Sequence, residues 1–225
     1  MAPSRRVECG DGLAFLARGR LPPDHAVVTS LPDHSELPRL GVAGWREWFV
    51  ESAAACCRAV DDGAVAIFFQ TDVKHDGGWI DKGFLVQLGA ERAQSRLLWH
   101  KIVCRLPAGQ TTFGRPGYAH LLCLGRRPAA APERALRLAP GQSSPDVLPR
   151  LGEMTWARAM GREACDAVAS FLLANTPCRT VVDPFCGVGT MLAVANAHGL
   201  DAVGVELSPK RAGKARDLVL PPPAP

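Results

Sequence analysis

The chain has 225 residues, of which 47% are hydrophobic and 21% are charged, and a formal net charge of +4. This composition can bury the core of one large domain and excludes a disordered chain, while so small a positive charge specifies no partner. No apolar run approaches the roughly 18 residues of a membrane-spanning helix, and the polar N-terminus predicts no secretory signal. We therefore expect no membrane partner.

The eight cysteines predict reduced thiols rather than disulfides or a metal site. None of them forms a C-x-x-C motif, and the six histidines do not stand at ligand spacing to them. Most lie inside apolar runs, where a free cysteine behaves as a small hydrophobic residue. We therefore expect no metal and a reducing intracellular compartment, the cytoplasm or nucleus, with an organelle left open.

Strands and helices are expected to alternate along the first half of the chain. In chain order the pattern predicts a strand and turn at 7–12, a helix at 13–18, a strand at 26–29, a polar loop at 30–36, a helix at 45–60 and a buried strand at 64–69. An exposed loop at 72–82 is followed by a helix at 84–93, a strand at 96–103, a Gly/Pro-rich loop at 107–117 and a strand at 118–124. The last two strands are expected to pair antiparallel.

The second half begins with a segment rich in Pro, Ala and Ser at 126–150, which predicts a flexible linker. The elements expected after it are a helix at 156–175, a strand at 179–183, a helix at 190–198, a strand that ends at Glu206, a helix at 208–218 and a tail at 221–225. Ser208 and Pro209 are typical of an N-cap and a first helical position. Strands alternating with helices predict an α/β fold with a mostly parallel sheet covered on both faces.

A turn in the last fifth of the chain predicts a ligand site. A buried strand ends in Asp183 and leads into a turn with Gly187 and Gly189, whose backbone can approach a ligand closely. Glu206 ends the next strand and is placed to accept hydrogen bonds from ribose hydroxyls. Leu192 stands where a dinucleotide-binding motif has its third glycine, and the Lys-Ser/Thr pair of a P-loop is missing. These features suit a nucleoside without phosphates, such as S-adenosylmethionine, and a glycine-rich turn without a ligand is the alternative.

The order of several motifs resembles a known enzyme family. The segments DPFCGVGT at 183–190 and VGVELSP at 203–209 resemble D-P-F-x-G-x-G-T and G-I-E-x-x-P, and they are preceded by CGDGL at 9–13, TSLPD at 29–33, LWHK at 98–101 and HLL at 120–122, which are similar to G-D-A-L, T-S-P-P-Y, I-W-H-K and a following strand. The catalytic segment thus precedes the cofactor segment. This order is that of the permuted, β-class-like S-adenosylmethionine-dependent amino-methyltransferases of DNA and RNA bases.

The resemblance implies a Rossmann-like class I methyltransferase fold with a circularly permuted motif order. Its seven-stranded, mostly parallel sheet would have the order 3-2-1-4-5-7-6, in which the strand ending in Asp183 neighbours the strand ending in Ser30. Residues 1–225 would then form a single methyltransferase domain. Its parts would be a catalytic-loop half at 1–125, a flexible linker at 126–150, a cofactor-binding half at 151–220 and a tail at 221–225.

The resemblance also assigns the cofactor-binding residues. Phe185 and the glycines would line the methionine and ribose side, Glu206 would hold the ribose, and Asp11 would meet the adenine amine unless it is an ordinary turn residue. Residues 160–162 are further candidates for the methionine end. The full set expected to bind S-adenosyl-L-methionine is Asp11, Asp183, Phe185, Cys186, Gly187, Gly189, Thr190, Glu206 and Leu207.

The same resemblance makes Ser30, Pro32 and Asp33 the expected catalytic residues. In the family, a polar side chain and a backbone carbonyl of this loop accept hydrogen bonds from the target amine, and an aromatic residue stacks on the flipped base. Here Leu31 replaces the first proline and Asp33 replaces the aromatic residue. The stacking platform is lost, and the new carboxylate could accept an amine hydrogen bond or act as a base towards a hydroxyl. An ordinary polar turn is the alternative.

We expect methyl transfer to nucleic acid, to RNA (tRNA or rRNA) rather than DNA, because the segment at 126–150 leaves little room for a target-recognition domain. Basic residues near the predicted loops could contact phosphates. These are Lys101, Arg105, Arg115, Arg126 and Arg127. The alternatives are a protein or small-molecule acceptor and a non-catalytic, cofactor-binding scaffold; a partner subunit or a homodimer is compatible with each.

Overall fold

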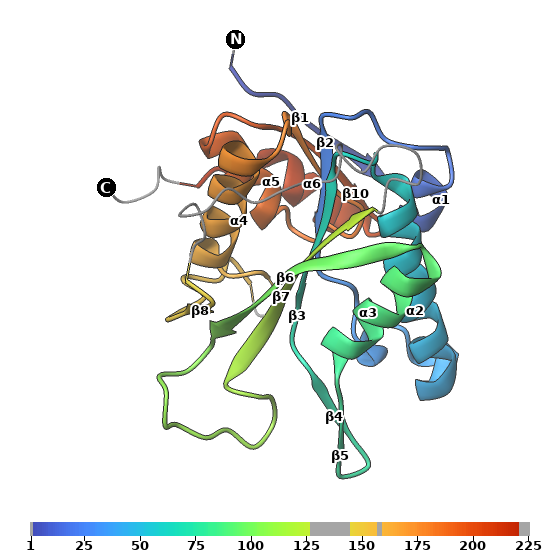
Figure 1. The fold of residues 1–225 in the computed structure, drawn as a ribbon, viewed down its shortest axis with the longest axis vertical. Coiled ribbons are helices and arrows are strands. Elements are labelled where there is room, and N and C mark those ends of the chain that lie inside the picture. Colours follow the sequence, from blue (N-terminus) through green and yellow to red (C-terminus); the bar gives the residue numbers. More distant parts are fainter. Residues whose placement is uncertain (1, 127–144, 157–158, 221–225) are drawn as a thin grey trace.

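The computed structural model describes residues 2–126, 145–156 and 159–220, in which strands and helices alternate (Figure 1). The α-helices are α1 (Gly12–Leu16), α2 (Gly41–Ala59), α3 (Lys82–Arg92), α4 (Arg162–Asn175), α5 (Thr190–Ala197) and α6 (Pro209–Asp217). The strands are β1 (Arg5–Cys9), β2 (His25–Thr29), β3 (Val65–Gln70), β4 (Val73–His75), β5 (Gly78–Ile80), β6 (Ser95–Cys104), β7 (Tyr118–Arg126), β8 (Val147–Leu148), β9 (Thr180–Asp183) and β10 (Asp201–Glu206). Short 3-10 turns span His34–Glu36 and Pro38–Leu40.

The central sheet has the strand order β1-β10-β9-β2-β3-β7-β6-β8. The five strands from β1 to β3 run parallel, and β7 is antiparallel to both β3 and β6. Strand β9 pairs with β2, which confirms that the strand ending in Asp183 lies beside the strand leading to Ser30. The carboxyl ends of strands from the two ends of the chain therefore meet at one edge of the sheet.

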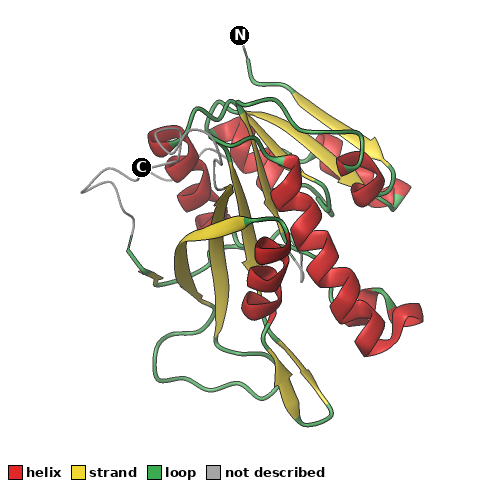
Figure 2. Cartoon of the chain, turned by 45° about the vertical axis from the view of Figure 1, so that its right-hand side comes forward, coloured by secondary structure: helices red, strands yellow, loops and turns green. Residues whose placement is uncertain are grey.

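Helices cover both faces of this sheet, which gives the three layers seen in Figures 1 and 2. Helices α1, α2 and α3 pack on one face, and α4, α5 and α6 pack on the other. All six side chains of β3 are buried: Ile67 faces the α4–α6 layer, whereas the neighbouring Phe68 faces the α1–α3 layer. Burial on both faces explains why β3 is a continuous apolar run in the sequence.

Short polar side chains begin three of the helices. Asp11 caps α1 and Asp81 caps α3, each by accepting a hydrogen bond from a backbone amide three residues later, at 2.9 and 2.8 Å. Ser208 caps α6 and Pro209 is its first residue, as expected. Two of these caps, Asp11 and Ser208, follow strands β1 and β10 directly and so lie at the carboxyl edge of the sheet.

The predicted exposed loop at 72–82 is wrong, because β4 and β5 form a hairpin there and Asp72 and Lys82 at its two ends are buried. Figure 2 shows this hairpin projecting from the end of the molecule. Its turn contains Asp76 and Gly77, with φ angles of 47° and 80°. An Asp-Gly pair with two positive φ angles is the usual signal of a tight hairpin turn.

Other differences concern the ends of elements. The sheet of the described residues has eight strands rather than seven, because β8 adds a short edge strand parallel to β6. Helix α4 begins at Arg162 rather than at 156, since its N-cap Gly161 crosses the backbone of Leu151 so closely that a Cβ would stand 2.1 Å from the Leu151 carbonyl oxygen. Most of the predicted linker (127–144) and the tail at 221–225 lie outside the described residues.

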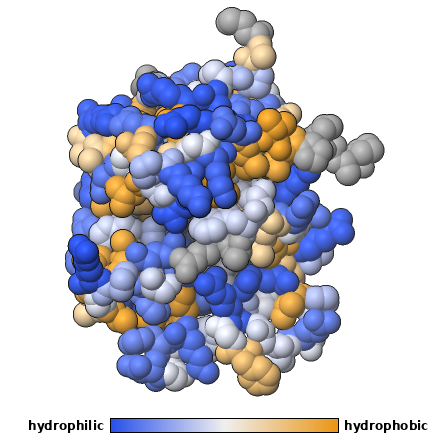
Figure 3. All heavy atoms as spheres, turned by 180° about the vertical axis from the view of Figure 1, so that it is seen from behind, coloured by the Kyte–Doolittle hydropathy of each residue, from blue (hydrophilic) through white to orange (hydrophobic). Residues whose placement is uncertain are grey.

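One face of the surface can be followed in Figure 3. On the face seen in Figure 3 the described residues are mostly hydrophilic, and hydrophobic ones form separate patches. Among the described helices, none has both the length and the apolar character that crossing a bilayer requires. All eight cysteines are free, as expected, and six of them are buried.

Candidate active site

A cavity of about 260 Å³ lies at the carboxyl ends of β1, β2, β9 and β10. It adjoins the β9–β2 boundary, where the direction of the strand order reverses, a position at which open α/β sheets bind ligands. Its wall contains most of the residues that the sequence singles out. These are Asp11, Ser30, Pro32, Asp33, Asp183, Phe185, Cys186, Gly187, Thr190, Glu206 and Leu207. The fold therefore brings the motifs from both ends of the chain into one hollow.

The two glycines of the turn have different surroundings. Gly187, at φ 56°, lines the cavity and faces the Trp156 ring, which a Cβ would meet at 3.5 Å. Gly189, at φ 85°, packs instead against α6, where a Cβ would stand 2.9 Å from the Cα of Ala215. Gly187 is thus favoured by its positive φ, whereas Gly189 also lets α5 and α6 pack closely.

Asp183 ties the turn to the neighbouring strand. Its carboxylate Oδ1 accepts a hydrogen bond from the Thr29 hydroxyl at 2.6 Å and another from the Phe185 amide at 3.1 Å. Burial raises the pKa of Asp183 to about 7, and the nearby charge of Glu206 acts in the same direction. The residue therefore fixes the position of Phe185 relative to β2.

Glu206 is 7% exposed and is held by the first turn of α6. Its Oε1 accepts hydrogen bonds from the Ser208 amide at 2.7 Å and from Arg211 Nε at 2.9 Å. Within the part of the chain that the structure describes, Oε2 accepts no hydrogen bond, so it is available to a ligand. Arg211, which the sequence analysis did not identify, also lies over the Trp156 ring at 5.9 Å.

Asp11 begins a helix and also lies in the cavity wall. Its Oδ1 caps α1, and the residue also lines the cavity. The following Gly12 passes so close to the glycine turn that a Cβ would stand 2.0 Å from the Pro184 carbonyl oxygen. The two motif regions therefore contact each other through their backbones.

The segment before α4 supplies a wall that the sequence analysis largely missed. Met154 and Trp156 line the cavity together with Met160, which was named as a candidate. The hydroxyls of Thr155 and Thr190 lie 2.5 Å apart and connect this segment to the start of α5. The sequence pattern placed Trp156 on a helix at 156–175 and so gave it no role in the site. In the structure Trp156 lies in the loop before α4.

Apolar and thiol side chains complete the cofactor side. Phe185 meets Trp48 edge to face, with ring centroids 5.9 Å apart. Cys186 is buried, and its burial raises the thiol pKa well above the ordinary value, so the group is a neutral thiol. Leu207 is 68% exposed and lies at the rim. These contacts make the wall partly apolar, which suits a ligand with a ring and a thioether-like group.

The loop at 29–33 lies on the other side of the cavity. Ser30 lines the wall, and its hydroxyl has no hydrogen-bond partner among the described residues. Leu31 is buried beneath it, and the Pro32 carbonyl accepts a hydrogen bond from Trp45 Nε1 at 3.0 Å. The loop is therefore anchored on both sides of Ser30, because Thr29 is bonded to Asp183.

Asp33 is an anchored carboxylate rather than a free one. Its Oδ1 lies 2.5 Å from the ammonium of Lys82, and its Oδ2 lies 3.2 Å from Arg115 Nη2. Lys82 is buried, which lowers its pKa, while Asp33 favours its charged form. Because both carboxylate oxygens are engaged, the geometry gives Asp33 a positioning role and leaves Ser30 as the unengaged polar group of the loop.

The comparisons with known proteins bear on the fold. No protein-family model and no curated protein matches the chain. Among solved structures, the chain is similar to TTHA0409, a putative DNA modification methylase from Thermus thermophilus, with 21% identity and a TM-score of 0.70 over 95% of this chain and 93% of that one. The complex of TTHA0409 with S-adenosyl-L-methionine is similar to the same extent, with 20% identity, a TM-score of 0.69 and the same coverage.

Two further solved structures are similar to the chain. The cytosine-N4-specific PvuII DNA methyltransferase has 11% identity and a TM-score of 0.70 over 96% of this chain and 86% of that one. The complex of M1.HpyAVI with SAM has 12% identity and a TM-score of 0.60 over 95% and 98%. The chain therefore has the expected Rossmann-like class I methyltransferase fold.

Proposed function

We propose that the protein is an S-adenosyl-L-methionine-dependent methyltransferase that modifies an amino group of nucleic acid. One observation carries the proposal: the glycine turn, the Glu206 carboxylate and Ser30 line one cavity. Glu206 is the acid expected to bind a ribose, and the Ser30 hydroxyl has no hydrogen-bond partner among the described residues. Two structures similar to the chain are complexes with this cofactor, which supports the proposal.

The cofactor would lie against the carboxyl ends of β9 and β10. Glu206 would accept hydrogen bonds from the ribose hydroxyls through Oε2, while Arg211 holds its other oxygen in place. Phe185 and Gly187 would line the methionine and ribose side, and Asp11 would lie at the adenine. S-adenosyl-L-methionine bound there supplies a methyl group on a sulfonium, an electrophile that needs alignment more than activation.

The acceptor would enter on the side of the 29–33 loop. The Ser30 hydroxyl would accept a hydrogen bond from the target amine and so point the nitrogen lone pair towards the methyl group. The anchors at Thr29 and Pro32 hold this hydroxyl in place before the acceptor arrives. Pre-positioning of this kind is the main contribution that a protein makes to an in-line transfer.

The order of the strands supports a permuted arrangement. Strands β9 and β10 come from the last part of the chain, yet they lie in the sheet between β1 and β2 from its beginning. A catalytic loop that precedes the cofactor turn in sequence can therefore still face it. The change from T-S-P-P-Y to TSLPD would replace a stacking ring by the Asp33–Lys82 pair.

Among nucleic acids, DNA is the substrate that we favour. The short segment at 126–150 favoured RNA in the sequence, but the similar structures are described as DNA modification enzymes. Exposed aromatic side chains on two projecting segments, and basic side chains in the cavity wall, support either nucleic acid. Trp79 of the β4–β5 hairpin is 50% exposed and Phe113 of the β6–β7 loop is 92% exposed, and Figures 1 and 2 show both segments projecting from the same end of the molecule. Arg105 and Arg115 of the β6–β7 loop line the cavity and could meet phosphates.

A label-transfer experiment tests this proposal. The protein is incubated with methyl-labelled S-adenosyl-L-methionine and separate pools of DNA, RNA and protein. We expect label in DNA, and we expect a Ser30→Ala variant to lose it while still binding the cofactor. Label in RNA alone or in protein alone would show that the acceptor is RNA or protein instead of DNA. Cofactor binding without label in any pool would favour the scaffold alternative, which the missing aromatic residue at position 33 supports.

A further inference from the structure

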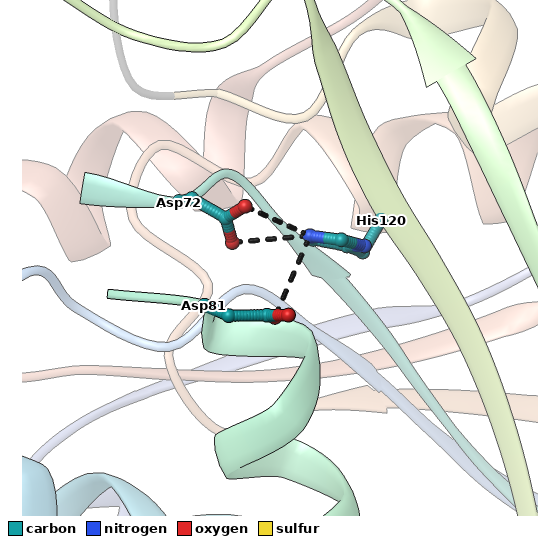
Figure 4. Close-up of side chains that lie close together, drawn as sticks. All are labelled: Asp72, Asp81 and His120. Carbon is teal, nitrogen blue, oxygen red and sulfur yellow. Dashed lines mark hydrogen bonds and ion pairs between the residues drawn. The ribbon is translucent and has the colours of Figure 1, made fainter. Parts of the chain in front are cut away.

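We propose that Asp72, Asp81 and His120 bind a divalent metal cation beside the active-site cavity. The three side chains come from different places: the connection between β3 and β4, the N-cap of α3 and the first part of β7. Figure 4 shows that both carboxylates point towards the same imidazole nitrogen. Asp72 and His120 are buried, whereas Asp81 is exposed, which leaves a path for an ion from solvent.

The distances suit a single ion. Nε2 of His120 lies 3.0 and 3.1 Å from the two carboxylate oxygens of Asp72 and 3.7 Å from Oδ1 of Asp81. One ligand atom from each residue lies within 4.8 Å of the others. Two ligands at about 2.1 Å from one tetrahedral zinc ion stand about 3.4 Å apart, so the ion needs only small side-chain movements. One imidazole and two carboxylates suit Zn²⁺, with water in the fourth position.

Neighbouring groups hold the three ligands in orientation. Nδ1 of His120 lies 3.0 Å from Nε2 of His100, so a proton on Nδ1 leaves Nε2 free to bind an ion. The Lys82 amide donates to Asp72 Oδ1 at 2.9 Å, and a backbone amide of α3 donates to Asp81 Oδ1. Gly83 lets α3 lie against His120, since a Cβ there would stand 3.1 Å from the imidazole. Metal ligands are commonly oriented in this way by a second layer of hydrogen bonds.

A buried amide next to the cluster provides independent support. Gln70 is fully buried, and within the described residues neither its amide nitrogen nor its amide oxygen has a hydrogen-bond partner. It lies directly opposite His120 in the β3–β7 ladder. Opposing residues project from the same face of a sheet, so the Gln70 side chain leaves the sheet next to that of His120. An unpartnered buried amide is unfavourable, and a water molecule on the cation would satisfy it.

The charges of the cluster also favour a cation. Both carboxylates form ion pairs with His120 alone among the described residues. The ammonium of Lys82 is directed to Asp33 instead. A divalent ion would balance the charge of the two carboxylates. Because the Lys82 backbone is bonded to Asp72, the ion would also fix the lysine that anchors Asp33 in the cavity wall.

Calorimetry on the chelator-treated full chain tests the proposal with Zn²⁺ as the probe. We expect one ion per chain. In an Asp81→Asn variant the side-chain oxygen still caps α3, because Asn is a good N-cap residue, so the helix is retained while the ligand charge is lost. We expect the variant to bind at least about tenfold more weakly, as with other losses around metal sites.

The control is Asp76→Asn, which changes an exposed aspartate at the tip of the β4–β5 hairpin. Asn tolerates the positive φ of this position. It should bind like the wild type. Co²⁺ absorption separates this site from the thiols: we expect the bands of an oxygen and nitrogen site without a thiolate charge-transfer band. Absence of binding by the wild type, a thiolate band, or equal binding by Asp81→Asn would each overturn the proposal. None of these measurements depends on methyl transfer.

Discussion

The two walls of the cavity are held together in different ways. On the cofactor side, Glu206 contacts Ser208 and Arg211, and Asp183 contacts Phe185, all within a few positions, and one long-range bond from Thr29 to Asp183 adds to them. On the acceptor side, Asp33 is anchored by Lys82 and Arg115, which are 49 and 82 positions away. The cofactor wall is therefore a local motif that a sequence can display, whereas the acceptor wall depends on the tertiary fold.

The largest expected effect concerns the acceptor wall. Lys82→Met removes the buried partner of Asp33 and leaves a buried carboxylate with Arg115 alone, so we expect the free energy of unfolding to fall by about 3–5 kcal/mol. Arg115→Met removes a half-exposed partner and should lower it by less than about 1 kcal/mol. Urea denaturation measures both.

A double variant gives the control for this prediction. Asp33→Leu combined with Lys82→Met removes both charges, and most of the lost stability should return, since apolar pairs often replace buried ion pairs without loss. A double variant as unstable as Lys82→Met alone would contradict the idea that the pair acts as a unit.

The next prediction distinguishes the two walls by their effects on kcat and on cofactor affinity. Ser30→Ala should lower kcat by about 100- to 1000-fold, as the removal of one positioned hydrogen-bonding group at a reacting centre typically does, with no change in cofactor affinity. Single-turnover methyl transfer measures it. Ser35→Ala, an exposed serine of the same loop region, should leave the rate unchanged. Equal rates for Ser30→Ala and the wild type would exclude the proposed role of this hydroxyl.

The matching change on the cofactor wall should affect binding alone. Glu206→Gln replaces a charged acceptor by a neutral one, so we expect the affinity for S-adenosyl-L-methionine to fall by about 10- to 150-fold, which corresponds to about 1.5–3 kcal/mol. Calorimetry measures it, and Asp217→Asn at the exposed end of α6 is the control. If the affinity stays the same, Glu206 is not the ribose acid.

The role of the second glycine predicts a difference between two similar variants. Gly189→Ala and Gly199→Ala both place a side chain at a φ near +80°, which costs about 1–2 kcal/mol. Only Gly189 faces a neighbour, α6, so its variant should be less stable by a further 1–3 kcal/mol or so. Equal losses in thermal unfolding would show that the contact between α5 and α6 can relax.

The last expected effect is a pH dependence on the cofactor wall. Burial raises the pKa of Asp183 from an ordinary 3.8 to about 7, so between these values the unfolded chain releases a proton that the folded chain keeps. The free energy of unfolding should therefore fall as the pH rises from about 4 to 7, by at most about 1.4 kcal/mol per pH unit, and level off above 7. Asp183→Asn retains an oxygen for both of its hydrogen bonds and should remove this slope. A slope unchanged in the variant would assign it to another group.

The sequence predicts the part of the cofactor wall that the glycine turn and Glu206 form, because the signals of that part are local. The strand that ends in Asp183, the glycines and the Ser208-Pro209 helix start are all visible in single short segments, and the alternation of elements predicts the α/β fold. The β4–β5 hairpin had a local signal too, the Asp-Gly pair at 76–77, within a segment that reads as a polar loop.

The acceptor wall was not predictable in the same way. Nothing in the sequence near Asp33 indicates that Lys82 lies beside it. From the sequence alone, an aspartate in place of an aromatic residue is interpreted as a carboxylate without a partner. The same holds for His120 and Asp72, which are 48 positions apart and contact each other only after β3 and β7 have paired. Long-range side-chain pairs of this kind follow from strand register, which the sequence pattern does not specify.

Calorimetric titration of the wild-type chain with S-adenosyl-L-methionine tests the central claim most directly, since every assignment on both walls starts from a cofactor in the cavity. We predict one binding site per chain, with competition by S-adenosylhomocysteine at the same site. A folded wild-type protein that binds neither compound would contradict the account.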